Sequence, residues 1–158
     1  IRGKTAALFA AATEVGGVIA GASEGMISGL NAYGDALGIS FQIVDDLLDY
    51  GGVSQSLGKN TGDDFRERKL TLPVIKAIAK ADETERAFWE RVIVKGNQNE
   101  GDFEHAMTLL HKHKTLEETR DAAIFWGAQA KAALNVLPQS EIRDLLADLT
   151  DFIIERAV

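Results

Sequence analysis

The hydrophobic positions of this chain recur with a helical period, and polar or glycine-containing segments separate the apolar stretches. A long helix is predicted from about Glu24 to Tyr50, after a turn near residues 22–24 and before Gly51 and Gly52. Further helices are predicted at about 72–81, 83–94, 102–113, 116–136 and 140–156. No alternating strand pattern competes with them, so the predicted fold class is all-α.

Residues that favour helix boundaries lie at the ends of these segments: Pro73, Asp82, Gly101, Thr115 and Pro138. The last segment is amphipathic, with one apolar side formed by Ile142, Leu145, Leu146, Leu149, Phe152 and Ile153. The irregularly spaced aromatic residues are interpreted as core rather than as a cofactor site: Phe88, Trp89, Phe103, Phe125 and Trp126.

An acidic cluster lies in the long helix predicted from Glu24. At about 100° per residue, Gln42, Asp45, Asp46 and Asp49 share one polar arc, and apolar residues cover the rest of the circumference. Three carboxylates on the polar strip of a largely buried helix repel one another, and a divalent cation with oxygen ligands offsets this cost. The pattern indicates a Mg²⁺ site, and the alternative is a solvated acidic face that binds nothing.

Basic residues accompany this cluster. Lys59 lies in a polar, Gly-containing stretch predicted to be a loop from Val53 to Asp64, Lys69 follows it, and Lys4 stands near the start of the chain. Carboxylates that hold magnesium, together with separate lysines that act as point charges for phosphate, make up the chemistry of a diphosphate site.

Three segments resemble the trans-polyprenyl diphosphate synthase family in order and spacing: GKTAALF at 3–9, YGDALGISFQIVDDLLDY at 33–50 and LGKNTGDDFRERKLTLP at 57–73. Their details are similar to the bacterial long-chain branch of octaprenyl and decaprenyl type. The resemblance implies an isoprenoid-synthase-type helical bundle, here truncated. It also implies one helical domain over 1–158, in which 1–81 carries the diphosphate and magnesium motifs and 82–158 the C-terminal helices.

The resemblance also implies a role for each matching residue. Asp45, Asp46 and Asp49 match the second aspartate-rich motif and would bind Mg²⁺, with Asp45 the most direct ligand. The positions that match contacts to the allylic diphosphate or its metal waters are Lys4, Thr5, Gln42, Lys59 and Lys69. Among all these residues, Asp45, Lys4 and Lys59 are expected to be catalytic.

The reaction implied by the family is condensation of an allylic diphosphate with isopentenyl diphosphate, which elongates a polyprenyl diphosphate for quinone side chains. The family's first aspartate-rich motif does not occur in this sequence. The sequence is therefore interpreted as the C-terminal half of a homodimeric enzyme, expected to be inactive and to self-associate alone. The alternatives are a non-catalytic subunit that retains a diphosphate pocket and, less in keeping with the GKT and KLTLP segments, a terpene-cyclising enzyme.

Composition narrows the function classes. A net charge of −7 argues against nucleic acid as a main partner, because nucleic-acid binding requires a basic surface. The absence of cysteine excludes disulfides and thiolate metal sites and fits a cytoplasmic location. No uninterrupted apolar stretch reaches the roughly 18 residues of a transmembrane segment, and no signal peptide is visible.

Overall fold

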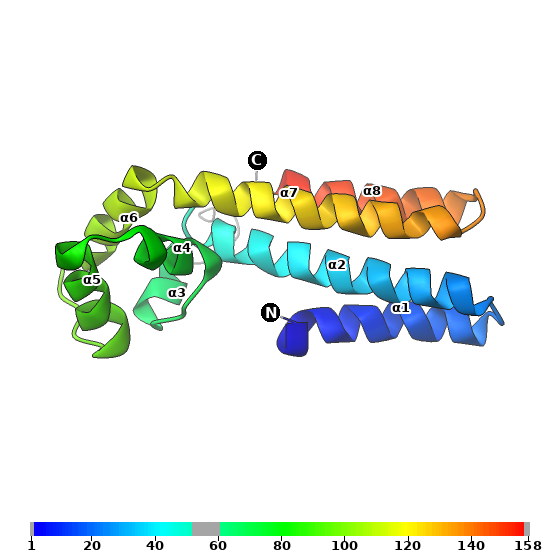
Figure 1. The fold of residues 1–158 in the computed structure, drawn as a ribbon, viewed down its shortest axis with the longest axis horizontal. Coiled ribbons are helices and arrows are strands. Elements are labelled where there is room, and N and C mark those ends of the chain that lie inside the picture. Colours follow the sequence, from blue (N-terminus) through cyan, green and yellow to red (C-terminus); the bar gives the residue numbers. More distant parts are fainter. Residues whose placement is uncertain (1, 52–60, 157–158) are drawn as a thin grey trace. The chain divides into compact units, whose positions relative to one another are not determined.

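The computed structural model describes residues 2–51 and 61–156, which form helices joined by short turns (Figure 1). No strand occurs within these two ranges, so the predicted all-α class is confirmed. The elements in chain order are η1 Arg2–Ala6, α1 Ala7–Ile19, α2 Glu24–Leu48, α3 Asp63–Arg66, α4 Leu72–Lys80, α5 Glu83–Trp89, η3 Glu90–Val94, α6 Asp102–Lys112, α7 Thr115–Ala133, η4 Leu134–Val136 and α8 Glu141–Glu155. None of the helices in the described ranges has the length and apolarity that crossing a membrane requires.

The chain divides into two compact units. The first contains residues 1–44 and 121–158, and the second contains residues 45–120. The boundaries fall inside α2 and α7, so each of these two helices contributes to both units.

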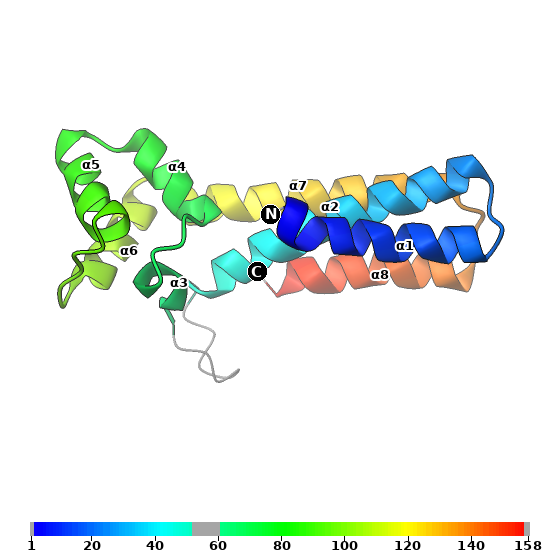
Figure 2. The same ribbon diagram turned by 90° about the horizontal axis from the view of Figure 1, so that it is seen from below.

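The first unit consists of α1, most of α2, most of α7, and α8. In both views α1 and α2 form one antiparallel hairpin, and α7 and α8 form another (Figures 1 and 2). The Tyr33 hydroxyl of α2 donates to the Leu146 carbonyl of α8 at 2.8 Å, and the Ser40 hydroxyl donates to the Ala123 carbonyl of α7 at 2.9 Å. A Cβ on Gly38 would lie 2.6 Å from the Cα of Ala6, so glycine permits close approach of the two backbones there.

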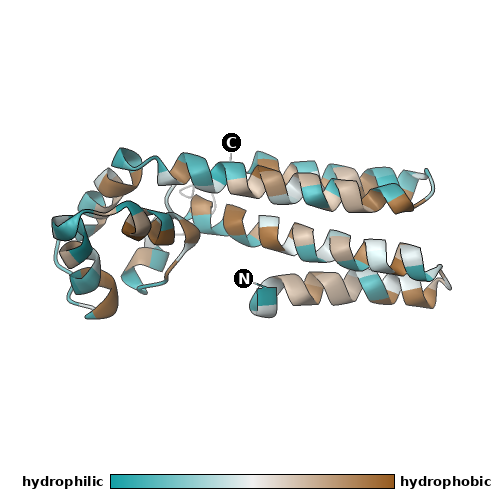
Figure 3. Cartoon of the chain, viewed as in Figure 1, coloured by the Kyte–Doolittle hydropathy of each residue, from teal (hydrophilic) through white to brown (hydrophobic). Residues whose placement is uncertain are grey.

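Several apolar residues of the first unit are exposed. The amphipathic side predicted for α8 buries Ile153, but Ile142, Leu145, Leu149 and Phe152 are exposed, and so are Leu8, Val15, Val18 and Ile19 of α1. Figure 3 shows apolar residues recurring along these helices. Phe125, which the sequence placed in the core, is 56% exposed. The period of α8 was therefore predicted correctly, but no other part of the described chain covers most of its apolar side.

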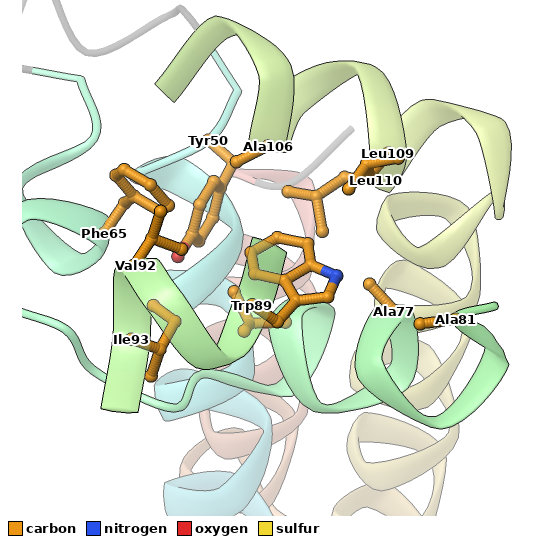
Figure 4. Packing of buried hydrophobic residues seen from close by; sticks show 11 residues of the cluster. Tyr50, Phe65, Ala77, Ala81, Trp89, Val92, Ile93, Ala106, Leu109 and Leu110 are labelled. Atoms are coloured by element: carbon orange, nitrogen blue, oxygen red, sulfur yellow. The ribbon is translucent and has the colours of Figure 1, made fainter. Parts of the chain in front are cut away.

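The second unit has a well-packed apolar core built around Trp89, which is 2% exposed (Figure 4). The buried members of the cluster are Tyr50, Phe65, Val74, Ala77, Ala81, Trp89, Val92, Ile93, Ala106, Leu109 and Leu110. Phe88 and Phe103 pack against this cluster and are partly buried, as the sequence predicted for aromatic core residues. The core joins α3, α4, α5, η3 and α6 into one body.

The start of α5 is fixed by local hydrogen bonds and by a buried acid. Asp82 accepts from the Glu85 N–H at 2.9 Å, and Glu85 accepts from the Asp82 N–H at 3.1 Å, which is a capping box. The Glu85 carboxylate also accepts from Lys112 at 2.6 Å and lies 2.8 Å from Nε2 of His113. Lys112 is the main cause that lowers the Glu85 pKa to about 2.

We expect Glu85→Gln to destabilise the second unit by about 1–3 kcal/mol at pH 7, because Lys112 and His113 lose the buried anion that they contact. The folded pKa of Glu85 lies below its ordinary value of 4.5, so the stabilisation is present above pH 4.5 and is lost as the pH falls towards 2. Urea unfolding at pH 7, 4 and 3 should therefore show a smaller difference between variant and wild type at lower pH. Exposed Glu83, in the same helical turn, is the control for Gln substitution, and a pH-independent difference would contradict the assignment.

Candidate diphosphate and metal site

The acidic motif lies at the C-terminal end of α2, with Asp45 and Asp46 inside the helix and Asp49 directly after it. Ile43, Val44 and Leu47 are buried, which fixes the rotation of the helix. Asp46 is buried as well, whereas Asp45 and Asp49 are partly exposed. The three carboxylates are therefore not equivalent, and Asp45 and Asp49 are the two that solvent reaches.

Asp49 is hydrogen-bonded to the start of α3 and to Gly62, the residue just before it. Its Oδ2 accepts a hydrogen bond from the Asp64 N–H at 3.0 Å, and its carbonyl accepts from the Gly62 N–H at 2.9 Å. Burial raises the pKa of the Asp49 carboxyl, the Asp64 N–H lowers it, and the charges of Asp64 and Asp63 raise it further. This carboxylate therefore lies in a region of negative charge that a bound cation would neutralise.

The Lys69 ammonium lies beside the same segment. Its Nζ is 2.7 Å from Oδ1 of Asp64 and 2.7 Å from Oε2 of Glu67. These two carboxylates raise the pKa of Lys69, with Asp64 the largest cause, so the side chain carries a full positive charge at neutral pH. The second unit thus links Asp49 and Lys69, two of the residues that the sequence singled out, through Asp64.

The first unit brings together two others. The Thr5 hydroxyl donates to Oε1 of Gln42 at 2.9 Å, which joins η1 to α2. Lys4 is exposed on η1. Lys59 lies outside the described residues.

The fit of a metal ion depends on how many oxygen ligands the chain can supply. No group of three or more His, Cys, Asp or Glu side chains is arranged to hold a metal within residues 2–51 and 61–156. Mg²⁺ commonly binds through only one or two carboxylates and completes its octahedral shell with water and substrate phosphate oxygens. The partly exposed Asp45 and Asp49 suit that mode of binding and do not suit an all-protein metal cage.

The sequence-based interpretation missed the contribution of Asp64 and Glu67 and the short helix α3. It treated the segment through Asp64 as loop, whereas α3 begins at Asp63. Acidic residues in the first turn, Asp63 and Asp64, are a signal that could have shown this helix start. The link to Asp49 spans 15 residues and has no such local signal.

Comparisons with known proteins agree with the motifs. The family model described as polyprenyl synthetase matches residues 1–110. A decaprenyl diphosphate synthase from Rhodobacter capsulatus is 66% identical with a TM-score of 0.94, over 100% of this chain and 49% of that one. A polyprenyl synthase from Caulobacter crescentus CB15, complexed with calcium and isoprenyl diphosphate, is 46% identical with a TM-score of 0.91, over 100% and 48%.

A curated relative gives the same picture. A short chain isoprenyl diphosphate synthase from Methanothermobacter thermautotrophicus is 40% identical over 97% of this chain and 46% of its own length. The chain thus spans about half the length of the relatives that it matches. The family match covers well over half of the 158 residues and includes all three motifs. The chain belongs to the polyprenyl synthetase family.

Proposed function

We propose that the whole protein condenses an allylic diphosphate with isopentenyl diphosphate and so elongates a polyprenyl diphosphate. The observation that carries this proposal is the linkage of Asp49, in a negatively charged region, to the segment that presents the Lys69 ammonium. A cation-binding carboxylate linked to a phosphate-binding ammonium is the combination that a metal diphosphate requires. The bound calcium and isoprenyl diphosphate of the Caulobacter relative support the same assignment.

The residues of this chain would share the work as follows. Asp45 and Asp49 would hold Mg²⁺, and the buried Asp46 carboxylate would add negative charge next to them. Mg²⁺, when bound, neutralises charge on the departing diphosphate. Lys4, Lys59 and Lys69 would donate to phosphate oxygens.

Thr5 and Gln42 would act as a pair. The Thr5 hydroxyl donates to the side-chain oxygen of Gln42 and so orients that side chain, whose amide group would contact a phosphate oxygen or a metal-bound water. We therefore assign Gln42 the contact and Thr5 the orientation of that contact.

The proposal also covers the length of the polyprenyl product and the cellular compartment in which it is made. The long-chain motif details and the decaprenyl synthase relative support a long polyprenyl product, used as a quinone side chain. The absence of cysteine fits the cytoplasm as the site of synthesis.

The exposed apolar sides of α1 and α8 indicate surfaces that bind another part of the protein or a second copy of it. Isolated soluble domains rarely expose so many large apolar residues on two helices. We propose that the upstream half of the synthase covers them in the whole protein and that the whole protein is a homodimer. The chain 1–158 by itself would then self-associate through these sides.

An elongation assay tests the function. We expect the whole protein to convert Mg²⁺, isopentenyl diphosphate and a farnesyl diphosphate primer into longer products, and chain 1–158 alone to form none. A single acidic motif supplies only one side of the clamp on the diphosphate. Circular dichroism would verify that the isolated chain is helical, and light scattering would measure its self-association.

Either of two results would contradict the proposal. A folded whole protein without elongation activity would show that the assigned reaction is wrong. Sustained elongation by chain 1–158, with host enzyme excluded, would show that one acidic motif is sufficient.

A further inference from the structure

Asp64 contacts both the acidic motif, at Asp49, and the Lys69 ammonium. Its backbone N–H donates to Oδ2 of Asp49 at 3.0 Å, and its Oδ1 accepts from Nζ of Lys69 at 2.7 Å. Its carbonyl also accepts from the backbone N–H of Lys69 at 2.9 Å. One residue thus holds an expected metal ligand through its main chain and an expected phosphate ligand through its side chain.

The segment around Asp64 is held firmly by the core of the second unit. Phe65 is buried and packs against Phe103, with ring centroids 5.8 Å apart. The side-chain amide of Gln98 donates to the Phe65 carbonyl at 2.9 Å. Gly62 has a positive φ of 87°, and a Cβ there would clash with the Phe103 ring. Asp64 therefore has a well-defined position.

Glu67 is the second carboxylate on the Lys69 ammonium, and its surroundings differ. Its Oε2 lies 2.7 Å from Nζ, but its side chain is 62% exposed, against 16% for Asp64. An exposed, long side chain gains little from such a pair because solvent competes and rotamer freedom is lost. The ammonium has three N–H donors, so an incoming anion can replace one carboxylate while the other remains.

We propose that Asp64 is a positioning residue that fixes the Lys69 ammonium, and that Glu67 is the carboxylate that a diphosphate oxygen replaces. This inference rests on the proposed role of Lys69 in diphosphate binding. Asp64 keeps the ammonium at a set place relative to Asp49, so that metal and phosphate groups are held together. Glu67 occupies the phosphate position in the absence of ligand.

Removing the charge of Asp64 and removing that of Glu67 should change diphosphate binding in opposite directions. In the whole protein, we expect Asp64→Asn to weaken the binding of inorganic diphosphate with Mg²⁺ by about fivefold, because the ammonium loses its fixed partner. Glu67→Gln should strengthen it by about twofold, because a competing anion is removed. Isothermal titration calorimetry measures both. Asp63→Asn is the control for charge, since it also removes a negative charge near Asp49 but from a residue paired with Arg66 and not with Lys69, so its effect should be clearly smaller than the fivefold loss in Asp64→Asn.

A double-mutant cycle separates positioning from a general structural effect. If Asp64 acts through Lys69, then Asp64→Asn should change diphosphate binding by less than about 1.5-fold in a Lys69→Met background. An undiminished fivefold loss in that background would overturn the proposal. Equal effects of Asp64→Asn and Asp63→Asn, or weaker binding by Glu67→Gln, would also overturn it.

A measurement without ligand keeps this test distinct from the test of the proposed function. NMR of the Lys69 side chain in the ligand-free protein should show it immobilised in wild type, mobile in Asp64→Asn and little changed in Asp63→Asn. An immobilised Lys69 in a wild-type protein that binds no Mg²⁺ diphosphate would contradict the proposed function alone. A Lys69 that is equally mobile in all variants would contradict the positioning role, whatever the binding result.

Discussion

Replacing Trp89 by Ala is expected to lower the free energy of unfolding by about 3–5 kcal/mol, the usual range for removing a large buried aromatic side chain. Trp89 is 2% exposed and lies at the centre of the second unit's core, so its loss leaves a cavity that the surrounding helices fill only partly (Figure 4). Urea or guanidinium unfolding, followed by the far-ultraviolet circular dichroism signal of the helices, would measure the change.

Two variants serve as controls for Trp89→Ala. Phe125→Ala removes an aromatic ring that is 56% exposed and should cost less than about 0.5 kcal/mol. Trp89→Phe should cost less than Trp89→Ala, because the ring remains and Nε1 of Trp89 has no hydrogen-bond partner among the residues that the structure describes. Equal losses for the two Trp89 variants would show that the cavity is not the cause.

Asp45→Asn in the whole protein is expected to reduce kcat/KM for chain elongation by about 30- to 1,000-fold. This corresponds to about 2–4 kcal/mol of lost charge stabilisation at the departing diphosphate. Asp45 is the partly exposed acid that the family resemblance identifies as the most direct Mg²⁺ ligand, whereas its neighbour Asp46 is buried. Steady-state kinetics at saturating Mg²⁺ would measure the change.

The control for Asp45→Asn is Asp121→Asn, an exposed acid outside the motif that should leave kcat/KM within about twofold of wild type. Unfolding curves for both variants would separate a loss of charge from a loss of structure. Wild-type turnover in Asp45→Asn would show that Asp45 does not contact the reacting diphosphate or its metal.

Helix positions were predictable because their signals are local. The long helix was expected from Glu24, where α2 begins, and Pro73 lies in the first turn of α4. Asp82 caps α5, and the Ser140 side chain accepts from the Arg143 N–H at 3.3 Å at the start of α8. Each of the two capping interactions joins residues three positions apart, so the sequence alone indicates where these helices begin.

The motif residues were also visible in the sequence, but their contacts were not. The position of Asp45 and Asp49 on one side of the chain, at the end of α2, follows from the helical period. The hydrogen bond from Asp64 to Asp49 and the pair between Thr5 and Gln42 span 15 and 37 residues. Such contacts depend on how the chain folds back on itself, which no local pattern specifies.

Burial was decided by the tertiary structure as well. Trp89 and Phe125 look alike as aromatic residues on amphipathic helices, yet one lies at the centre of a core and the other is exposed. The apolar side of α8 was predicted correctly, but only Ile153 of the residues discussed above is buried. Periodicity determines which side of a helix is apolar, whereas burial requires a second element to cover that side, and only the tertiary arrangement supplies it.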